Sequence, residues 1–130
     1  MLIKKLVDMK STKPTYCIYV IELNKKVLDK KKFRKENPDY IDGMPCVYVG
    51  YTSRTPEIRL NQHLKGKRNK KGYRLFNRYA HNFGEVLRPR DYEYLNRFMN
   101  KKSISKEAAM NLEVKKAESL RRKGFAVWQK

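Results

Sequence analysis

Acidic residues are scarce in this sequence. Among its 130 residues, 13 Asp and Glu stand against 32 Lys and Arg, which gives a formal net charge of +19. This surplus says little about the fold and much about the partners of the protein. Nucleic acid is the first candidate, because lysines and arginines that neutralise a phosphate backbone release its counterions.

Long apolar runs are also missing. No stretch approaches the length of a membrane-spanning helix, and the segment Met1–Asp8 lacks the sustained apolar core of a signal peptide. No long basic helix with a bulky apolar face stands out, which argues against binding at a membrane surface. We therefore expect a cytoplasmic protein whose partners do not include a membrane.

Cysteine is limited to Cys17 and Cys46. Two cysteines cannot form a metal cage, and disulfides are rare in the cytosol, so we interpret both as small buried hydrophobic residues. The sequence contains neither a phosphate-binding glycine loop nor a nucleophile motif, which leaves a small-molecule enzyme without support. With 40% apolar residues and no internal repeat or linker, the chain is predicted to form a single domain over residues 1–130.

Several short segments rich in β-branched and aromatic residues are predicted to be strands. The clearest are residues 16–23, 46–49 and 125–128. In the first of them, alternation places Tyr19 and Ile21 on the same face. Another strand is expected within residues 86–95, where Pro89 has to lie at an edge or an end.

The strongest helix signal follows the second strand. Thr55 suits the N-cap, Pro56 suits the first helical position, and Gly66 suits the C-terminal end. On this helix Arg59 and His63 lie one turn apart, so they share a face.

Two more helices are predicted further along the chain. A short amphipathic helix is expected from Tyr73 to about His81. A long helix is expected to begin after Ser103 or Ser105, either of which can act as the N-cap, and to end near Lys123. The apolar residues of the short helix are Leu75, Phe76 and Tyr79.

Two basic segments flank this central region. The first is an insertion over residues 24–44, which is too long for a plain hairpin loop and is predicted to contain a weak helix over residues 25–35. The second is a loop over residues 65–72. Both segments could simply be solvated faces, but with so few acids to balance them we favour a surface that tracks phosphates. The predicted nucleic-acid contacts are Lys30, Lys31, Lys32, Arg34, Lys67, Arg68, Lys70 and Lys71.

The last helix carries a carboxylate on its apolar side. On a helical wheel, Glu113 falls in the middle of the apolar arc, which consists of Ala109, Met110, Ala117 and Leu120. A carboxylate in a core-facing position is costly unless a cation accompanies it. One hypothesis is an ion pair with an arginine. The other is a site for Mg²⁺ (or Mn²⁺), since Mg²⁺ commonly takes one or two carboxylates and keeps most of its waters.

Two tyrosine triplets precede the helix that carries the arginine. Cys17-Ile18-Tyr19 stands where GIY-YIG nuclease domains have Gly-Ile-Tyr, and Tyr48-Val49-Gly50 stands where they have Tyr-Ile-Gly. Arg59 and His63 match the helix arginine of that family and the histidine that follows it in many members. Ala109–Glu113 resembles the helix that carries the metal-binding glutamate. Over about residues 16–128, the chain resembles a GIY-YIG nuclease domain.

The resemblance implies an α/β (α+β) domain in which helices flank a three-stranded antiparallel sheet. It also implies a metal-dependent endonuclease that hydrolyses phosphodiester bonds, with DNA favoured over RNA. Glu113 would hold Mg²⁺ or Mn²⁺, and Arg59 would contact the scissile phosphate. Tyr19 would activate water, which requires a nearby cation to lower a phenol pKa that is ordinarily near 10. Tyr48 and His63 would position water or phosphate and assist proton transfer.

A second hypothesis is a nucleic-acid-binding module without hydrolysis, for instance an RNA- or ribosome-associated protein on the same scaffold. It is motivated by the extreme charge, by Cys17 in place of glycine, and by the missing asparagine after the glutamate helix, where the nearest candidates are Trp128 and Gln129. A pure binder, however, has no need for Glu113 in the centre of an apolar helix face.

Overall fold

The computed structural model describes residues 15–102 and 104–129. Two expectations fall outside this part of the chain. They are the absence of a signal peptide at Met1–Asp8 and the choice of Ser103 as a helix cap. Within the described residues, the fold is α+β, as predicted, and is built on one sheet.

The sheet has four strands in the order β3-β1-β2-β4. The prediction of three antiparallel strands is wrong, because β1 pairs antiparallel with β2 and β3, whereas β2 and β4 are parallel. The long last helix returns the chain to the end where β2 begins, so β4 starts beside Cys46 and runs in the same direction. The strands are β1 (Cys17–Leu23), β2 (Cys46–Thr52), β3 (Gly84–Leu87) and β4 (Ala126–Gln129).

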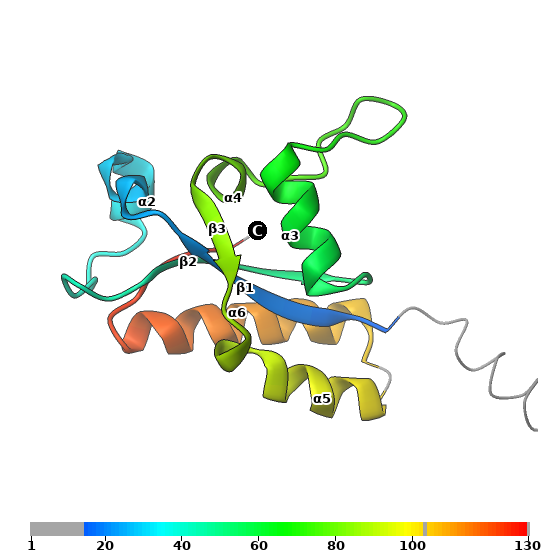
Figure 1. Cartoon of the computed structure of the whole chain (residues 1–130). Helices are drawn as coiled ribbons and strands as arrows, with labels where there is room; N and C mark the ends of the chain where they lie inside the picture. The colour runs from blue at the N-terminus through cyan, green and yellow to red at the C-terminus, as the bar shows by residue number, and fades with distance from the viewer. Residues whose placement is uncertain (1–14, 103, 130) are drawn as a thin grey trace, which may run out of the picture.

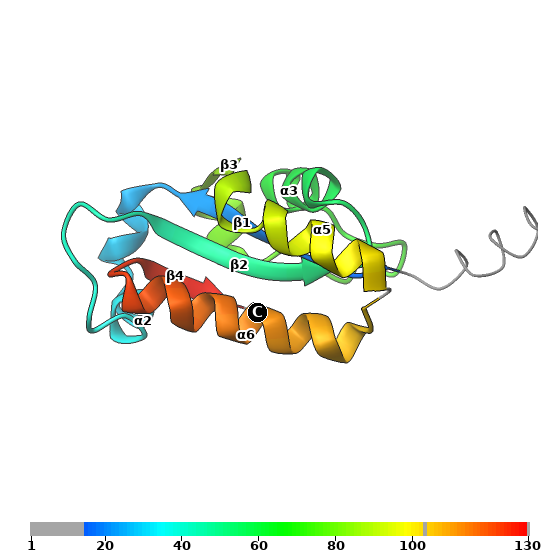
Figure 2. The same ribbon diagram turned by 90° about the horizontal axis from the view of Figure 1, so that it is seen from below.

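Helices cover both faces of this sheet (Figures 1 and 2). On one face lie α3 (Pro56–Lys65) and α4 (Arg78–Phe83), and on the other lie α5 (Glu93–Lys102) and α6 (Lys106–Arg122). No helix in the described ranges combines the length and the apolar character needed to cross a bilayer. Shorter elements complete the chain: η1 (Lys25–Asp29), α2 (Lys31–Lys35) and η2 (Pro89–Asp91).

The caps of the two helices that matter for the site follow from their sequences. Thr55 Oγ1 accepts a hydrogen bond from the Ile58 amide, and Gly66 ends α3 with φ of 63°, as expected for a glycine C-cap. Ser105 Oγ accepts from the Ala108 amide and begins α6. These predictions are confirmed.

The short helix predicted from Tyr73 to about His81 is wrong in its position. The helix α4 begins only at Arg78, because the Asn77 side chain accepts from the Tyr79 and Ala80 amides and caps it there. Leu75 belongs instead to the loop between α3 and α4, where its amide donates to Lys67 O at 2.8 Å. The strand expected within residues 86–95 is only partly correct, because β3 ends at Leu87. Pro89 lies in η2, and residues 93–102 form α5.

The basic insertion over residues 24–44 contains η1 and α2. Val27 and Phe33 are buried and Leu28 is half-buried. The single weak helix predicted over residues 25–35 is wrong in its continuity, because the backbone is extended at Lys30 and divides it into η1 and α2. The Phe33 ring stacks against Trp128 of β4 with centroids 6.4 Å apart. The inner side of the insertion is therefore part of the core.

Two asparagine side chains close the open edges of the sheet. Asn37 donates to Val127 O at 3.0 Å and accepts from Val127 N at 2.7 Å. On the other side of the sheet, Asn96 pairs in the same way with both backbone groups of Ile18, at 2.8 and 2.9 Å. A carboxamide carries a donor and an acceptor and so takes the place of another strand. Exposed strand edges are sites of unwanted pairing, and these contacts block them.

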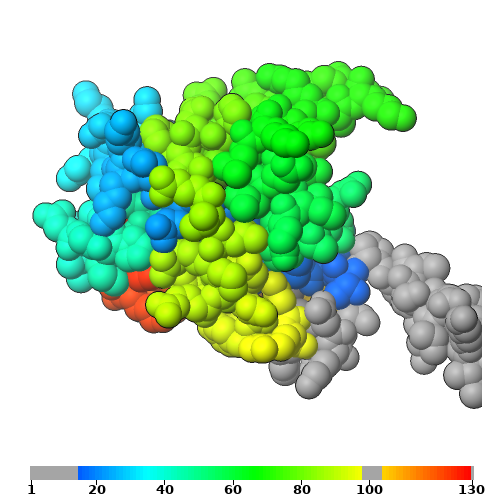
Figure 3. All heavy atoms as spheres, viewed as in Figure 1, coloured from blue at the N-terminus to red at the C-terminus, as the bar shows by residue number. Residues whose placement is uncertain are grey.

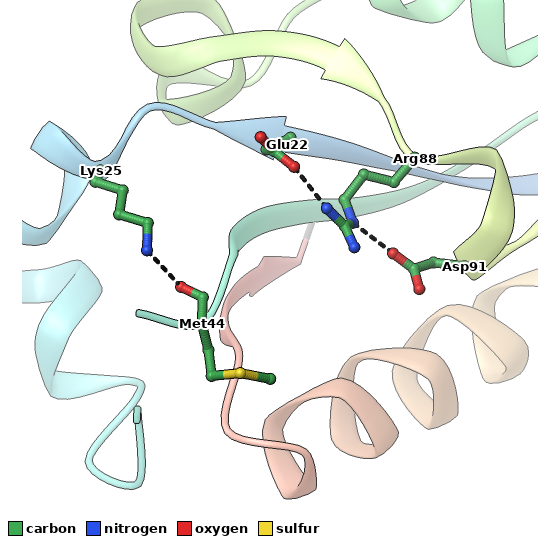
Figure 4. A network of polar contacts seen from close by, with 5 residues as sticks. All are labelled: Glu22, Lys25, Met44, Arg88 and Asp91. Atoms are coloured by element: carbon green, nitrogen blue, oxygen red, sulfur yellow. Dashed lines mark hydrogen bonds and ion pairs between the residues drawn. The ribbon is translucent and has the colours of Figure 1, made fainter. Parts of the chain in front are cut away.

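Arg88 bridges two carboxylates on the β3 side of the sheet (Figure 4). Arg88 donates to Glu22 Oε1 at 2.6 Å and also to Asp91 Oδ2. Its guanidinium lies 5.5 Å from the centroid of the Phe125 ring. These contacts tie β1, the end of β3 and η2 together.

We predict that Asn37→Ala destabilises the protein by about 1–3 kcal/mol, because it leaves the Val127 amide buried without its acceptor. Chemical denaturation followed by circular dichroism measures the change. Asn61→Ala, the same substitution at an exposed position of α3, is the matched control and should cost close to nothing. Equal losses for the two variants would show that Asn37 does not close the edge.

Candidate active site

Four of the five predicted catalytic residues line one open cavity of about 670 Å³. They come from four separate elements, with Tyr19 on β1, Tyr48 on β2, Arg59 on α3 and Glu113 on α6. The fifth, His63, is fully buried behind them and contacts the tyrosines. The fold therefore brings together all five residues that the sequence singled out.

The position of Tyr19 depends on the glycine of the second triplet. Tyr19 lies directly opposite Gly50 in the β1–β2 pair. A Cβ atom at Gly50 would lie 2.4 Å from the Tyr19 hydroxyl and 2.5 Å from its Cζ. Only a residue without a side chain leaves room for the phenol to lie across β2.

His63 is held from both sides of its ring. Nδ1 lies 2.9 Å from the Asn77 amide nitrogen, and Nε2 lies 2.9 Å from the Tyr19 hydroxyl. Because a backbone amide can only donate, we assign Nδ1 as the acceptor and place the proton on Nε2. In this tautomer His63 donates to the oxygen of Tyr19.

Burial, together with the positive charge of Arg59, lowers the pKa of His63 to about 3. The imidazole is therefore neutral near pH 7. This favours a positioning role for His63 over the transfer of protons.

Arg59 is fixed by contacts on both sides. Its Nη1 donates to Gln62 Oε1 at 2.6 Å and to Leu75 O at 2.7 Å. Its Nη2 lies 3.1 Å from His63 Nε2, but because Nε2 carries the proton this contact is not a hydrogen bond. The side chain is half-buried and still lines the cavity, so the guanidinium is preorganised to meet an anion there.

Burial raises the pKa of both tyrosines, and for Tyr48 well above its ordinary value. The charge and the hydrogen bond of Arg59 act against this at Tyr19, and so does the interaction with Tyr48. His63 Nε2 lies against the same oxygen. Donors arranged around a phenolic oxygen stabilise its deprotonated form.

Glu113 is 6% exposed on α6 and lines the cavity with the two tyrosines. Its negative charge adds to burial in raising the pKa of Tyr19 and of Tyr48. Ala109, Ala117 and Leu120 are buried as the wheel predicted, whereas Met110 is 45% exposed. That part of the predicted arc is wrong, because α6 turns Met110 away from the sheet.

A divalent metal fits this donor set in one way. Among the described residues, no group of three His, Cys, Asp and Glu side chains could form a metal site made of protein alone. A hydrated Mg²⁺ needs only one or two carboxylates and completes its shell with water and phosphate oxygens. Glu113 at the wall of an open cavity meets that requirement.

Several other residues of the cavity wall were not predicted from the sequence. Lys106 lies seven positions before Glu113 on α6, so helical spacing could have placed the two on one face. Tyr16 contacts Tyr51 with ring centroids 6.3 Å apart, a pairing that depends on strand register and has no local signal. These additional lining residues are Tyr16, Tyr51, Arg54, Gln62 and Lys106.

The two predicted basic segments lie toward opposite ends of the molecule (Figures 1 and 2). Lys30, Lys31, Lys32 and Arg34 are exposed on and beside α2. The second basic segment is the loop after α3. Asn69 and Leu75 of this loop line the cavity. Its cations Lys67, Arg68, Lys70 and Lys71 are all exposed.

No family model, no curated protein and no solved structure matches the chain. The function of the chain is therefore to be inferred from the geometry of the cavity and from the charges around it.

We predict that Gly50→Ala costs about 1–3 kcal/mol, because the Tyr19 ring has to move. In a Tyr19→Leu background, which removes the end of the ring, the same substitution should cost much less. A double-mutant cycle by chemical denaturation measures the coupling between the two positions. Additive effects would contradict the packing of Tyr19 against Gly50.

We predict that His63 makes the protein less stable in acid. Folded His63 stays neutral to about pH 3, whereas the unfolded residue takes up a proton below about pH 6.5. Between these values its contribution falls by about 1.4 kcal/mol per pH unit as the pH drops. The free energies of unfolding of the parent protein and of His63→Gln, measured by chemical denaturation at each pH, should therefore converge as the pH falls toward 4. Parallel pH profiles would contradict the burial of a neutral imidazole.

Proposed function

We propose that this protein is a metal-dependent endonuclease that hydrolyses phosphodiester bonds in DNA. The observation that carries the proposal is the convergence of Tyr19, Tyr48, Arg59 and Glu113 on one cavity, in a chain of net charge +19. Hydrolysis of a phosphodiester needs a cation, a donor for the charge that develops on the phosphate, and a base for the attacking water. The cavity offers a residue for each role.

Arg59 is the residue that would bind the scissile phosphate. Its planar guanidinium can bind two oxygens at once. Gln62 and Leu75 O hold Nη1, which orients the fork before the substrate arrives. Preorganised donors of this kind stabilise developing charge without reorganisation during the reaction.

Tyr19 is the residue that would activate the attacking water. Burial keeps its phenol protonated at neutral pH in the protein alone. Arg59 and Tyr48 lower the pKa of Tyr19, and His63 Nε2–H faces its oxygen, which favours the deprotonated form that a base requires. His63 positions Tyr19, and the Tyr48 hydroxyl supports the same oxygen.

Glu113 would hold Mg²⁺ or Mn²⁺ at the cavity wall. Such an ion would polarise the phosphate and favour deprotonation of groups beside it. The mixture of Glu113 with Arg59 and Lys106 in one cavity suits a site that receives a cation and an anion together.

The resemblance of the two tyrosine triplets to GIY-YIG nuclease domains supports the same function. The order Tyr19, Tyr48, Arg59, His63, Glu113 agrees with that family, and the described α+β fold is compatible with it. We propose membership of this family on the basis of that order and of the shared cavity.

We predict that the purified protein nicks supercoiled plasmid DNA with Mg²⁺ or Mn²⁺ and that a chelator abolishes nicking. Glu113→Gln and Arg59→Ala should each lower the rate at least about 100-fold, which is the cost of losing one preorganised electrostatic group. Agarose gels measure the conversion to open circles. Glu118→Gln, an exposed acid on the same helix, is the matched control and should cut like the parent.

Nicking that survives both Glu113→Gln and Arg59→Ala would contradict the assignment and indicate a contaminant. Binding of DNA without cleavage under either metal would favour the nucleic-acid-binding module instead. Circular dichroism of each variant separates a lost reaction from a lost fold.

A further inference from the structure

The loop after α3 forms a narrow arm over Lys67–Phe76. It leaves the helix at Gly66, returns to α4 at Asn77, and projects from the body of the molecule (Figures 1 and 3). The arm has a defined conformation. The Asn69 amide donates to Tyr73 O at 2.9 Å, and the Tyr73 amide donates to Asn69 Oδ1 at 3.0 Å.

The tip of the arm is fixed by further contacts. Arg68 Nη1 donates to Gly72 O at 2.9 Å, and Gly72 adopts a φ of 88° that suits glycine. At the root, the guanidinium groups of Arg68 and Arg74 each lie 5.8 Å from the centroid of the Phe76 ring. The arm is therefore shaped before any ligand binds.

The root of the arm is joined to the candidate catalytic groups. Leu75 O accepts a hydrogen bond from Arg59, and the amide of Asn77 donates to His63. Asn69 and Leu75 also line the cavity. Tyr73 is two residues from Leu75, so their Cα atoms lie within about 7 Å of each other. The exposed ring of Tyr73 is therefore carried on the same segment as the carbonyl that Arg59 contacts.

The surface of the arm combines cations with one exposed aromatic ring. The segment contains no acid, and the Tyr73 side chain is 68% exposed, more than that of any other large hydrophobic residue in the described chain. Cations are sufficient to bind a phosphate backbone. They do not explain why a preformed arm holds a ring in solvent. The cations of the arm are Lys67, Arg68, Lys70, Lys71 and Arg74.

An exposed aromatic beside phosphate-binding cations suits a nucleobase whose face is open. Within a paired duplex each base is covered by its neighbours, whereas an unpaired base offers a face for stacking. We propose that the preferred DNA substrate has an unpaired nucleotide next to the cleaved phosphate, and that Tyr73 stacks on its base. This inference rests on the proposed function for the choice of DNA, but it concerns binding and can be tested without cleavage.

The test compares two fluorescent DNA duplexes of the same sequence, one fully paired and one with a single unpaired 2-aminopurine nucleotide. Glu113→Gln protein is used with Mg²⁺, so that the DNA stays intact during the titration. The protein should bind the unpaired DNA more tightly, and 2-aminopurine fluorescence should change on binding. Adding Tyr73→Ala should reduce the preference about tenfold, as expected for one base–aromatic stack.

Two matched variants separate stacking from other contacts. Tyr73→Phe keeps the ring and should keep the preference, because stacking does not use the hydroxyl. Lys70→Gln with Lys71→Gln removes charge and should weaken binding to both duplexes equally. A loss in Tyr73→Phe as large as in Tyr73→Ala would overturn the proposal in favour of a hydroxyl–phosphate contact. Equal losses on the two duplexes in Tyr73→Ala would also overturn it.

The outcome is distinguishable from a failure of the proposed function. A parent protein that nicks DNA while Tyr73→Ala keeps the full preference would refute the stacking and leave the nuclease intact. A Tyr73-dependent preference in a parent protein that cuts nothing would refute the nuclease and support the stacking. Tighter binding of an RNA duplex with the same unpaired nucleotide would overturn the choice of DNA.

Discussion

The register that sets Tyr19 opposite Gly50 is the constraint on which the candidate site depends. A slip of one residue between β1 and β2 would turn Tyr19 away from Tyr48 and from α3, because side chains alternate across a strand. The missing side chain at Gly50 lets the phenol cross the neighbouring strand and reach His63. The two triplets therefore determine how β1 and β2 pack at this point, and they also supply the phenols of Tyr19 and Tyr48.

Electrostatics inside the site follow from the same packing. His63 is buried beside Arg59, so a proton on its ring would add a second positive charge in a place without solvent. A neutral imidazole can donate from Nε2 and orient Tyr19 without competing for an anion. The positive charge that faces the cavity then comes from Arg59, Arg54 and Lys106, and Glu113 is the carboxylate among the lining residues. Under the proposed function, this balance suits a phosphate accompanied by a metal ion.

Sequence patterns with local causes predicted the fold well, and patterns with distant causes did not. The caps Thr55 and Ser105 act within one turn, so their helices begin where expected. The apolar spacing around Phe76 is compatible with a helix as well as with a loop. In the fold the segment is a loop, and the ring packs under Arg68 and Arg74 at the root of the arm. The parallel direction of β4 had no local signal at all, because it depends on where α6 returns the chain.

The insertion over residues 24–44 illustrates why charge alone does not locate a binding surface. Its buried side supports the sheet, since Phe33 packs on Trp128 and Asn37 closes the edge of β4. Its lysines face solvent at the end of the molecule away from the arm (Figure 1). Under the proposed function, contacts at α2 would add affinity along a nucleic-acid backbone. Contacts at the arm would decide which phosphate enters the cavity, because the arm is hydrogen-bonded to Arg59 through Leu75 O.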